Sequence, residues 1–216
     1  MASSRGATRR VVGRALAVAS AFAVLLGVAP AALAGGLGGY LEGEFSWSEI
    51  NDHGQDRGFS ASMGGIGVLW DSDVSTNDPL NFRLQFGYRL GERELDEEKD
   101  EIVNGLTLDA TVGYGVLRSP AMRVWAGPSL RLNYDWYSSV GDIDIVDLGI
   151  GIGPRFGVNL HMSETLSVTG SVAYHYMYLS ELIEQDGHNR TIDGPQHMVG
   201  VRIGVLWLGE DDIFEE

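Results

Sequence analysis

Three residues on one predicted β-strand, and just beyond it, have the side chains of a hydrolase. Ser171, His175 and Glu181 could serve as nucleophile, base and orienting acid if they lay within hydrogen-bond reach of one another. Residue alternation, however, places Ser171 and His175 on the polar face of their segment. A hydrogen-bonded interior histidine is the simpler interpretation, so we expect no catalytic residues and no enzyme activity.

Metal-binding chemistry is suggested only by two acidic stretches. "GERELDEEKDE" (91–101) holds seven carboxylates in eleven residues, and "ELIEQDGHNRTID" (181–193) adds more. Such runs usually form solvated surface loops, and the alternative is Ca²⁺ or Mg²⁺ binding by flexible carboxylates. His53 and His188 lie in polar segments where solvation is expected, and no His or carboxylate spacing forms a metal motif. We therefore expect no cofactor and no metal centre outside those loops.

A second set of charged residues recurs between apolar ones along many segments of the chain. These residues are Glu42, Glu44, Arg83, Arg89, Asp109, Arg123, Arg131, Asp135, Asp147, Arg155 and Arg202. Six arginines against five carboxylates is the near-balance that a confined polar interior needs, because unpaired buried charge costs several kcal/mol. Arginine also bonds carboxylates bidentately, although a preference for arginine codons would give the same composition. The set predicts an ion-pair network.

The elements that would hold these residues are β-strands. "LNFRLQFGYRL" (80–90) has an apolar residue at every second position, with Arg83 and Arg89 on the other face. Eight such segments follow one another from Gly39, and the chain has thirty glycines and no long period-3.6 pattern. The fold class is therefore all-β. In the glycine-rich second segment the apolar row is Phe59, Ala61, Met63 and Leu69.

Connections alternate in length along the predicted strands. Short ones lie at 71–79, 118–122 and 161–164, whereas long ones include 91–101 and 181–195. An eight-stranded barrel encloses only enough space for side chains or one small ligand. The many bulky apolar residues cannot fit there, which excludes a soluble cup with an apolar interior. We expect an eight-stranded antiparallel up-and-down transmembrane β-barrel with the charged residues in its lumen.

Aromatic residues near the strand ends predict two girdles at the membrane interfaces. The girdle residues are Trp47, Phe59, Tyr88, Trp136 and Tyr178 near the long loops and Phe82, Tyr114, Phe156 and Trp207 near the short turns. Pro128 and Pro154 fall almost opposite each other, and because proline removes a ladder donor we expect a bulge or local twist there.

Residues 1–34 have the features of a cleaved export signal. Arg5 to Arg14 form a basic region, an apolar run follows, and Ala32-Leu33-Ala34 precedes Gly35. The alternative is an uncleaved membrane anchor. Cleavage leaves 35–216 as the barrel domain, and it makes the net charge still more negative than −15, which argues against nucleic acid as a partner. The chain has no cysteine, so no disulfide contributes to stability.

The closing segment "HMVGVRIGVLWL" has a glycine, alternating apolar residues and an aromatic finish. With the eight segments, it resembles the small eight-stranded outer-membrane barrels of Gram-negative bacteria, the OmpA/OmpX-type superfamily. The tail "GEDDIFEE" departs from that pattern. The resemblance implies Sec export, the outer-membrane insertion machinery as a partner, and contact with outer-membrane lipid and lipopolysaccharide.

Function follows less directly, because one fold serves many roles. The main hypothesis is a structural, envelope-integrity or surface-interaction barrel with an ion-paired lumen and acidic extracellular loops. The alternatives are a narrow or gated pore for small polar solutes and a lipid A-modifying outer-membrane enzyme.

Overall fold

A computed structural model describes residues 35–52, 55–72, 79–95, 101–139, 143–185 and 188–208. The predicted signal segment and the acidic C-terminal tail lie outside the described residues. Among the residues that are described, no helix is long and apolar enough to cross a membrane.

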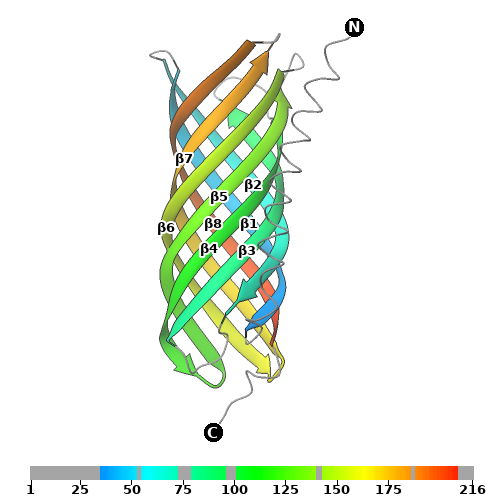
Figure 1. The fold of residues 1–216 in the computed structure, drawn as a ribbon, viewed down its shortest axis with the longest axis vertical. Helices are drawn as coiled ribbons and strands as arrows, with labels where there is room; N and C mark the ends of the chain where they lie inside the picture. The colour runs from blue at the N-terminus through cyan, green and yellow to red at the C-terminus, as the bar shows by residue number, and fades with distance from the viewer. Residues whose placement is uncertain are drawn as a thin grey trace. The chain divides into compact units, whose positions relative to one another are not determined.

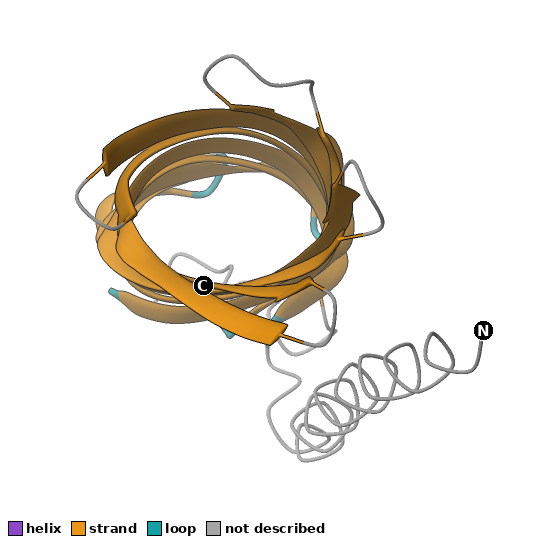
Figure 2. Ribbon diagram, turned by 90° about the horizontal axis from the view of Figure 1, so that it is seen from above, coloured by secondary structure: helices purple, strands orange, loops and turns teal. Residues whose placement is uncertain are grey.

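Eight antiparallel strands form a closed barrel in which each strand pairs with its neighbours in sequence and β8 pairs with β1 (Figures 1 and 2). The strands are β1 (Gly36–Asp52), β2 (Gln55–Asp71), β3 (Leu80–Leu95), β4 (Glu101–Ser119), β5 (Met122–Ser139), β6 (Ile143–Ser163), β7 (Leu166–Gln185) and β8 (His188–Leu208). The predicted fold class is confirmed.

The strands are longer than the sequence indicated at one end of the barrel. β3 continues to Leu95, and β7 and β8 together cover most of 181–195, so the expectation of long loops at 91–101 and 181–195 is wrong. Charged residues in these stretches continue the alternation of the strands instead of ending it. We call this the loop end; the opposite, turn end holds the connections 120–121 and 164–165, at the bottom of Figure 1.

Side chains alternate between an apolar outer wall and a polar interior along each strand. In β3, Leu80, Phe82 and Leu90 are exposed, whereas Arg83 and Arg89 are buried. The same inversion holds around the barrel, because large exposed hydrophobic residues occur on all eight strands. An exposed apolar band of this extent is stable only in lipid.

β2 reverses the predicted orientation of its side chains. Phe59, Ala61, Met63 and Leu69, expected on the outer wall, are buried, and Ile66 and Val68 are exposed instead. The placement of Phe59 in the loop-end girdle is therefore wrong. This segment contains so many glycines that neither its odd-numbered nor its even-numbered residues stand out as the polar face. Pairing with β1 and β3 determines which set faces lipid.

Pro128 and Pro154 are direct cross-strand partners, and the β5–β6 register runs past them without a shift. The expected bulge in this hairpin is wrong. The N–H groups that proline lacks affect the two neighbouring ladders instead. The β4–β5 ladder has no pairs between Thr111 and Tyr114, and the β6–β7 ladder has none between Ile152 and Arg155. The register shifts of these two ladders lie at Gly115/Leu117 and His161/Ser163.

Glycines make room for the largest interior side chains. Trp125 is fully buried, and a Cβ added at Gly157 would overlap its indole ring, with Cε2 at 2.5 Å. A Cβ at Gly43, on the outer wall of β1, would meet nothing within 4 Å. A substitution at Gly157 therefore measures the cost of crowding the lumen, and the same substitution at Gly43 measures the cost of replacing a glycine alone.

We predict that Gly157→Ala lowers the free energy of unfolding by about 1–3 kcal/mol, because the methyl group overpacks against an immobile indole. Urea unfolding of the barrel refolded into lipid vesicles measures the change. Gly43→Ala is the matched control, and its urea midpoint should equal that of the wild type. Equal midpoints for both variants would show that the interior is not closely packed at Trp125.

Candidate functional site

The centre of the lumen is organised around the carboxylate of Asp109, on β4. Asp109 is fully buried, and it accepts hydrogen bonds from Arg155 Nη2 at 2.6 Å and from Arg202 Nη2 at 2.6 Å. Arg131 Nη1 lies 3.4 Å away. Its partners come from β5, β6 and β8, so one carboxylate ties together four strands that surround the lumen.

Two glutamates from β1 complete this central layer. Glu42 pairs with Arg202 at 2.5 Å, and Glu44 pairs with Arg131 and, at 2.8 Å, with Arg89. Arg89 also binds Asp135 through both its Nε and Nη2 atoms, in a bidentate pair. The layer therefore holds equal numbers of each charge: Arg89, Arg131, Arg155 and Arg202 against Glu42, Glu44, Asp109 and Asp135.

A separate polar layer lies toward the turn end around Arg83. Its guanidinium binds Asp71 at 2.5 Å, Asn159 at 2.9 Å and Thr169 at 3.0 Å. The same guanidinium lies over the ring of Trp125, 4.4 Å from its centroid. Arg83 therefore has every type of partner that stabilises a buried arginine: a carboxylate, neutral oxygens and an aromatic face.

Beyond these layers the lumen contains apolar side chains, which the sequence did not lead us to expect. Toward the turn end, Tyr40, Leu69 and Leu206 form a buried cluster. Toward the loop end there are two clusters of buried residues, Met63, Val103, Tyr137 and Ile145 in one and Phe59 and Leu179 in the other. We call these the apolar caps. They place the charged centre between two water-excluding ends.

Arg93 joins the apolar cap at the loop end to two buried carboxylates. It donates to Asp147 at 3.2 Å and to Glu181 at 2.8 Å, and it also bonds the Tyr137 hydroxyl. Its guanidinium lies 3.8 Å from the ring centroid of Phe59. Sequence reasoning missed Arg93 and Glu181 as network members because it ended the strands too early, and it missed Asp71 because it also reversed the orientation of β2. The signal was present, because Arg93 continues the alternation of Arg83 and Arg89.

All eleven residues predicted for the lumen network are buried. Ten of them take part in the ion pairs described above, and Arg123 donates to the Pro79 carbonyl at 3.4 Å. Eight of the nine predicted girdle residues are exposed or half-buried on the outer wall: Trp47, Tyr88, Trp136, Tyr178, Phe82, Tyr114, Phe156 and Trp207.

The three residues considered for hydrolysis are not brought together. His175 lies four positions after Ser171 and Glu181 lies six positions after His175 on one extended strand, which corresponds to about 13 Å and 20 Å. His175 is buried with Nε2 3.7 Å from Asp109, and Glu181 binds Arg93. A different serine–histidine pair exists, Ser167 with His161 at 2.7 Å, but Ser167 is fully buried.

Within the described ranges, no group of three or more acidic or histidine side chains is arranged to hold a metal ion. Residues 96–100, which carry the densest part of the first acidic stretch, lie outside the described residues. Ca²⁺ or Mg²⁺ binding by the acidic segments stays a prediction.

The closed strand topology, the apolar outer wall and the charged interior define a β-barrel that crosses a membrane with its strands. Residues 18–205 match the family model described as outer membrane protein beta-barrel domain, and the chain belongs to this family of outer-membrane proteins. No curated protein matches the sequence.

The chain is similar to several solved outer-membrane proteins. OprG from Pseudomonas aeruginosa has 11% identity and a TM-score of 0.53, over 79% of this chain and 95% of its own. Ail, the attachment invasion locus protein of Yersinia pestis, has 11% identity and a TM-score of 0.41, over 80% and 97%. The outer membrane protease OmpT from Escherichia coli has 8% identity and a TM-score of 0.36, over 81% and 96%. At these identities the similarity to OprG shows the fold alone.

We predict that Asp109→Asn lowers the free energy of unfolding by about 3–5 kcal/mol, because it leaves the central guanidinium groups short of one negative charge in a closed interior. Urea titration in lipid vesicles measures the loss. Glu92→Gln, at an exposed position of β3, should stay within about 0.5 kcal/mol of the wild type. A similarly small effect of Asp109→Asn would mean that the central ion pairs contribute little to stability.

Proposed function

We propose that this protein is a non-conducting outer-membrane anchor that holds extended β-hairpins above the membrane, in a structural or surface-interaction role. The observation that carries the proposal is the lumen, which bonded polar side chains and apolar caps occupy from the turn end to the loop end. An anchor needs a stable barrel and no passage through it.

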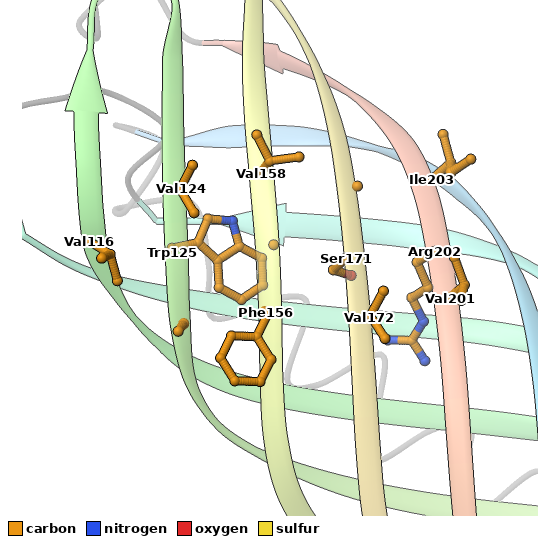
Figure 3. Close-up of a pocket in the computed structure, with 13 residues that line it drawn as sticks. Val116, Val124, Trp125, Phe156, Val158, Ser171, Val172, Val201, Arg202 and Ile203 are labelled. Carbon is orange, nitrogen blue, oxygen red and sulfur yellow. The ribbon is translucent and has the colours of Figure 1, made fainter.

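The packing of the lumen supports this role over a pore. A narrow or gated pore would require the pairs of Asp109 and Glu44 to separate, and also the displacement of the apolar caps. A cavity of about 590 Å³ lies elsewhere, where its exposed lining residues are apolar and face lipid, among them Val116, Phe156 and Ile203 (Figure 3). Its position on the outer wall gives no route across the membrane.

The loop end supports a role at the surface. Several outward positions beyond the aromatic residues are polar and exposed, among them Glu92 and Glu94 on β3 and Thr191 and Asp193 on β8, although Ile102 on β4 is exposed and apolar. Strands that keep pairing beyond the apolar band form a rigid polar collar, and rigid scaffolds commonly position surface segments for recognition. The acidic segments, with Ca²⁺ or Mg²⁺ as bridging ions to lipopolysaccharide phosphates, are part of this proposal.

Enzyme activity of the lipid A-modifying kind has less support. Such activity needs a nucleophile or activated water close to the acyl chains or headgroup. Ser167 is fully buried and its partner His161 is half-buried, and Ser171 and His175 are about 13 Å apart on the inner face.

We predict that the purified protein gives no stable conductance steps in planar bilayers. A general porin inserted under the same conditions shows that the assay detects channels, and resistance to denaturation by SDS without heating shows that the tested barrel is folded. Reproducible conductance steps from folded protein would overturn the proposal and favour the pore.

A further inference from the structure

A histidine lies among aromatic residues on the outer wall near the loop end. His197 on β8 is the direct cross-strand partner of Trp47 on β1 and of Tyr176 on β7. Its ring stacks on Trp47, with centroids 5.3 Å apart and planes at 13°, and meets Tyr176 edge-on at 5.3 Å. The Tyr174 hydroxyl lies 2.7 Å from its Nδ1 atom. We call these four residues the His197 cluster.

This cluster differs from an ordinary aromatic girdle. The girdle on the β3 and β5 strands contains Tyr88 and Trp136 at 6.4 Å, and the Tyr88 hydroxyl is already bonded to Asn104 at 2.6 Å. In the His197 cluster, Nδ1 is used by Tyr174, but Nε2 has no hydrogen-bond partner among the described residues. A half-buried imidazole with one nitrogen held and the other open provides a directed hydrogen-bonding group on the membrane-facing wall.

The position of the cluster fits the outer interface of the membrane. From Trp207 in the turn-end girdle to His197 there are ten residues of β8, with Val199, Val201 and Ile203 exposed between them. Ten residues of strand tilted by about 40° span about 25 Å, the height of the apolar band of outer-membrane barrels. At the loop end the paired hairpins continue past the apolar band, and in outer-membrane barrels the longer segments outside the membrane face outward, so His197 lies level with the headgroups of the outer leaflet.

The chemistry of the cluster favours a saccharide over a bare phosphate. Trp47, Tyr174 and Tyr176 are all exposed and offer flat apolar faces, against which the apolar face of a sugar ring can pack. The nearest outward charge along β8 is Asp193, a carboxylate that can accept from sugar hydroxyls but repels phosphate. The net charge of −15 repels free anions in the same way.

We propose that the His197 cluster binds the saccharide headgroup of an outer-leaflet glycolipid, lipopolysaccharide in a Gram-negative outer membrane, with a sugar ring on the aromatic faces and a hydroxyl on His197 Nε2. This site is independent of the state of the lumen, so it stands whether or not the barrel conducts.

Histidine-selective NMR in nanodiscs tests the site. The protein is placed in phosphatidylethanolamine discs with and without lipopolysaccharide, and His197→Gln identifies the signal of interest. We expect the imidazole signal of His197 to shift in proportion to added lipopolysaccharide, while those of the interior residues His161 and His175 stay in place.

Two double variants separate the cluster from a general aromatic effect. Trp47→Leu with Tyr176→Leu should weaken the apparent lipopolysaccharide affinity about fivefold. Tyr88→Leu with Trp136→Leu removes the same kinds of ring from the other side of the barrel and should leave it unchanged. An absent His197 shift, an equal shift with phospholipid alone, or equal weakening by both double variants would overturn the proposal. Resistance of each variant to SDS without heating verifies its fold.

Discussion

A closed tube of strands surrounded by hydrocarbon cannot leave a charge unmatched, and this constraint governs the rest of the structure. The central charged side chains are buried between the apolar caps, so each guanidinium there must be neutralised by a carboxylate from another strand. The central layer meets the constraint with four charges of each sign. Arginine meets it better than lysine, because one guanidinium can bond two or three acceptors on different strands.

The network also depends on closure of the barrel. Glu42 and Arg202 are separated by 160 positions in sequence, yet they are neighbours across the β1–β8 seam. Asp109 then joins Arg202 to Arg155. The Glu42–Arg202 pair cannot form until the first and last strands meet, so it stabilises the completed barrel. Asp109 and Arg131, by contrast, are direct partners within the β4–β5 hairpin.

Sequence patterns were sufficient for the architecture, because lipid demands a continuous apolar face and the alternation in β3, β4 and β8 shows it. Sequence patterns gave wrong predictions where both faces of a strand looked alike, and where charged residues of a strand were interpreted as a loop. Gly64, Gly65 and Gly67 hid the orientation of β2, so that Phe59 was placed in lipid. The charge of Arg93 and Glu181 was interpreted as solvation, although both residues continue an inner row. The missing N–H of Pro128 predicted a break in strand pairing. Which of its two ladders loses the pairs depends on how the strands pair in the barrel and not on the local sequence.

The interior caps lie beyond what periodicity can show. Leu69, Val103 and Leu206 are apolar residues at inward positions, and alternation alone treats every inward position of a membrane barrel as polar. Their role follows only from the register, which brings the ends of several strands together. The proposed non-conducting role depends on this feature, because a charged lumen without caps would admit water and ions.

Site-directed spin labelling on β4 tests the central claim most directly, because the chain has no native cysteine. Single cysteines at Leu106, Leu108 and Ala110 should give labels accessible to oxygen dissolved in lipid, and cysteines at Thr107 and Thr111 should give labels shielded from both oxygen and a polar nickel reagent. The reverse alternation, or polar-reagent access at the two threonine positions, would contradict an interior sealed from lipid and water.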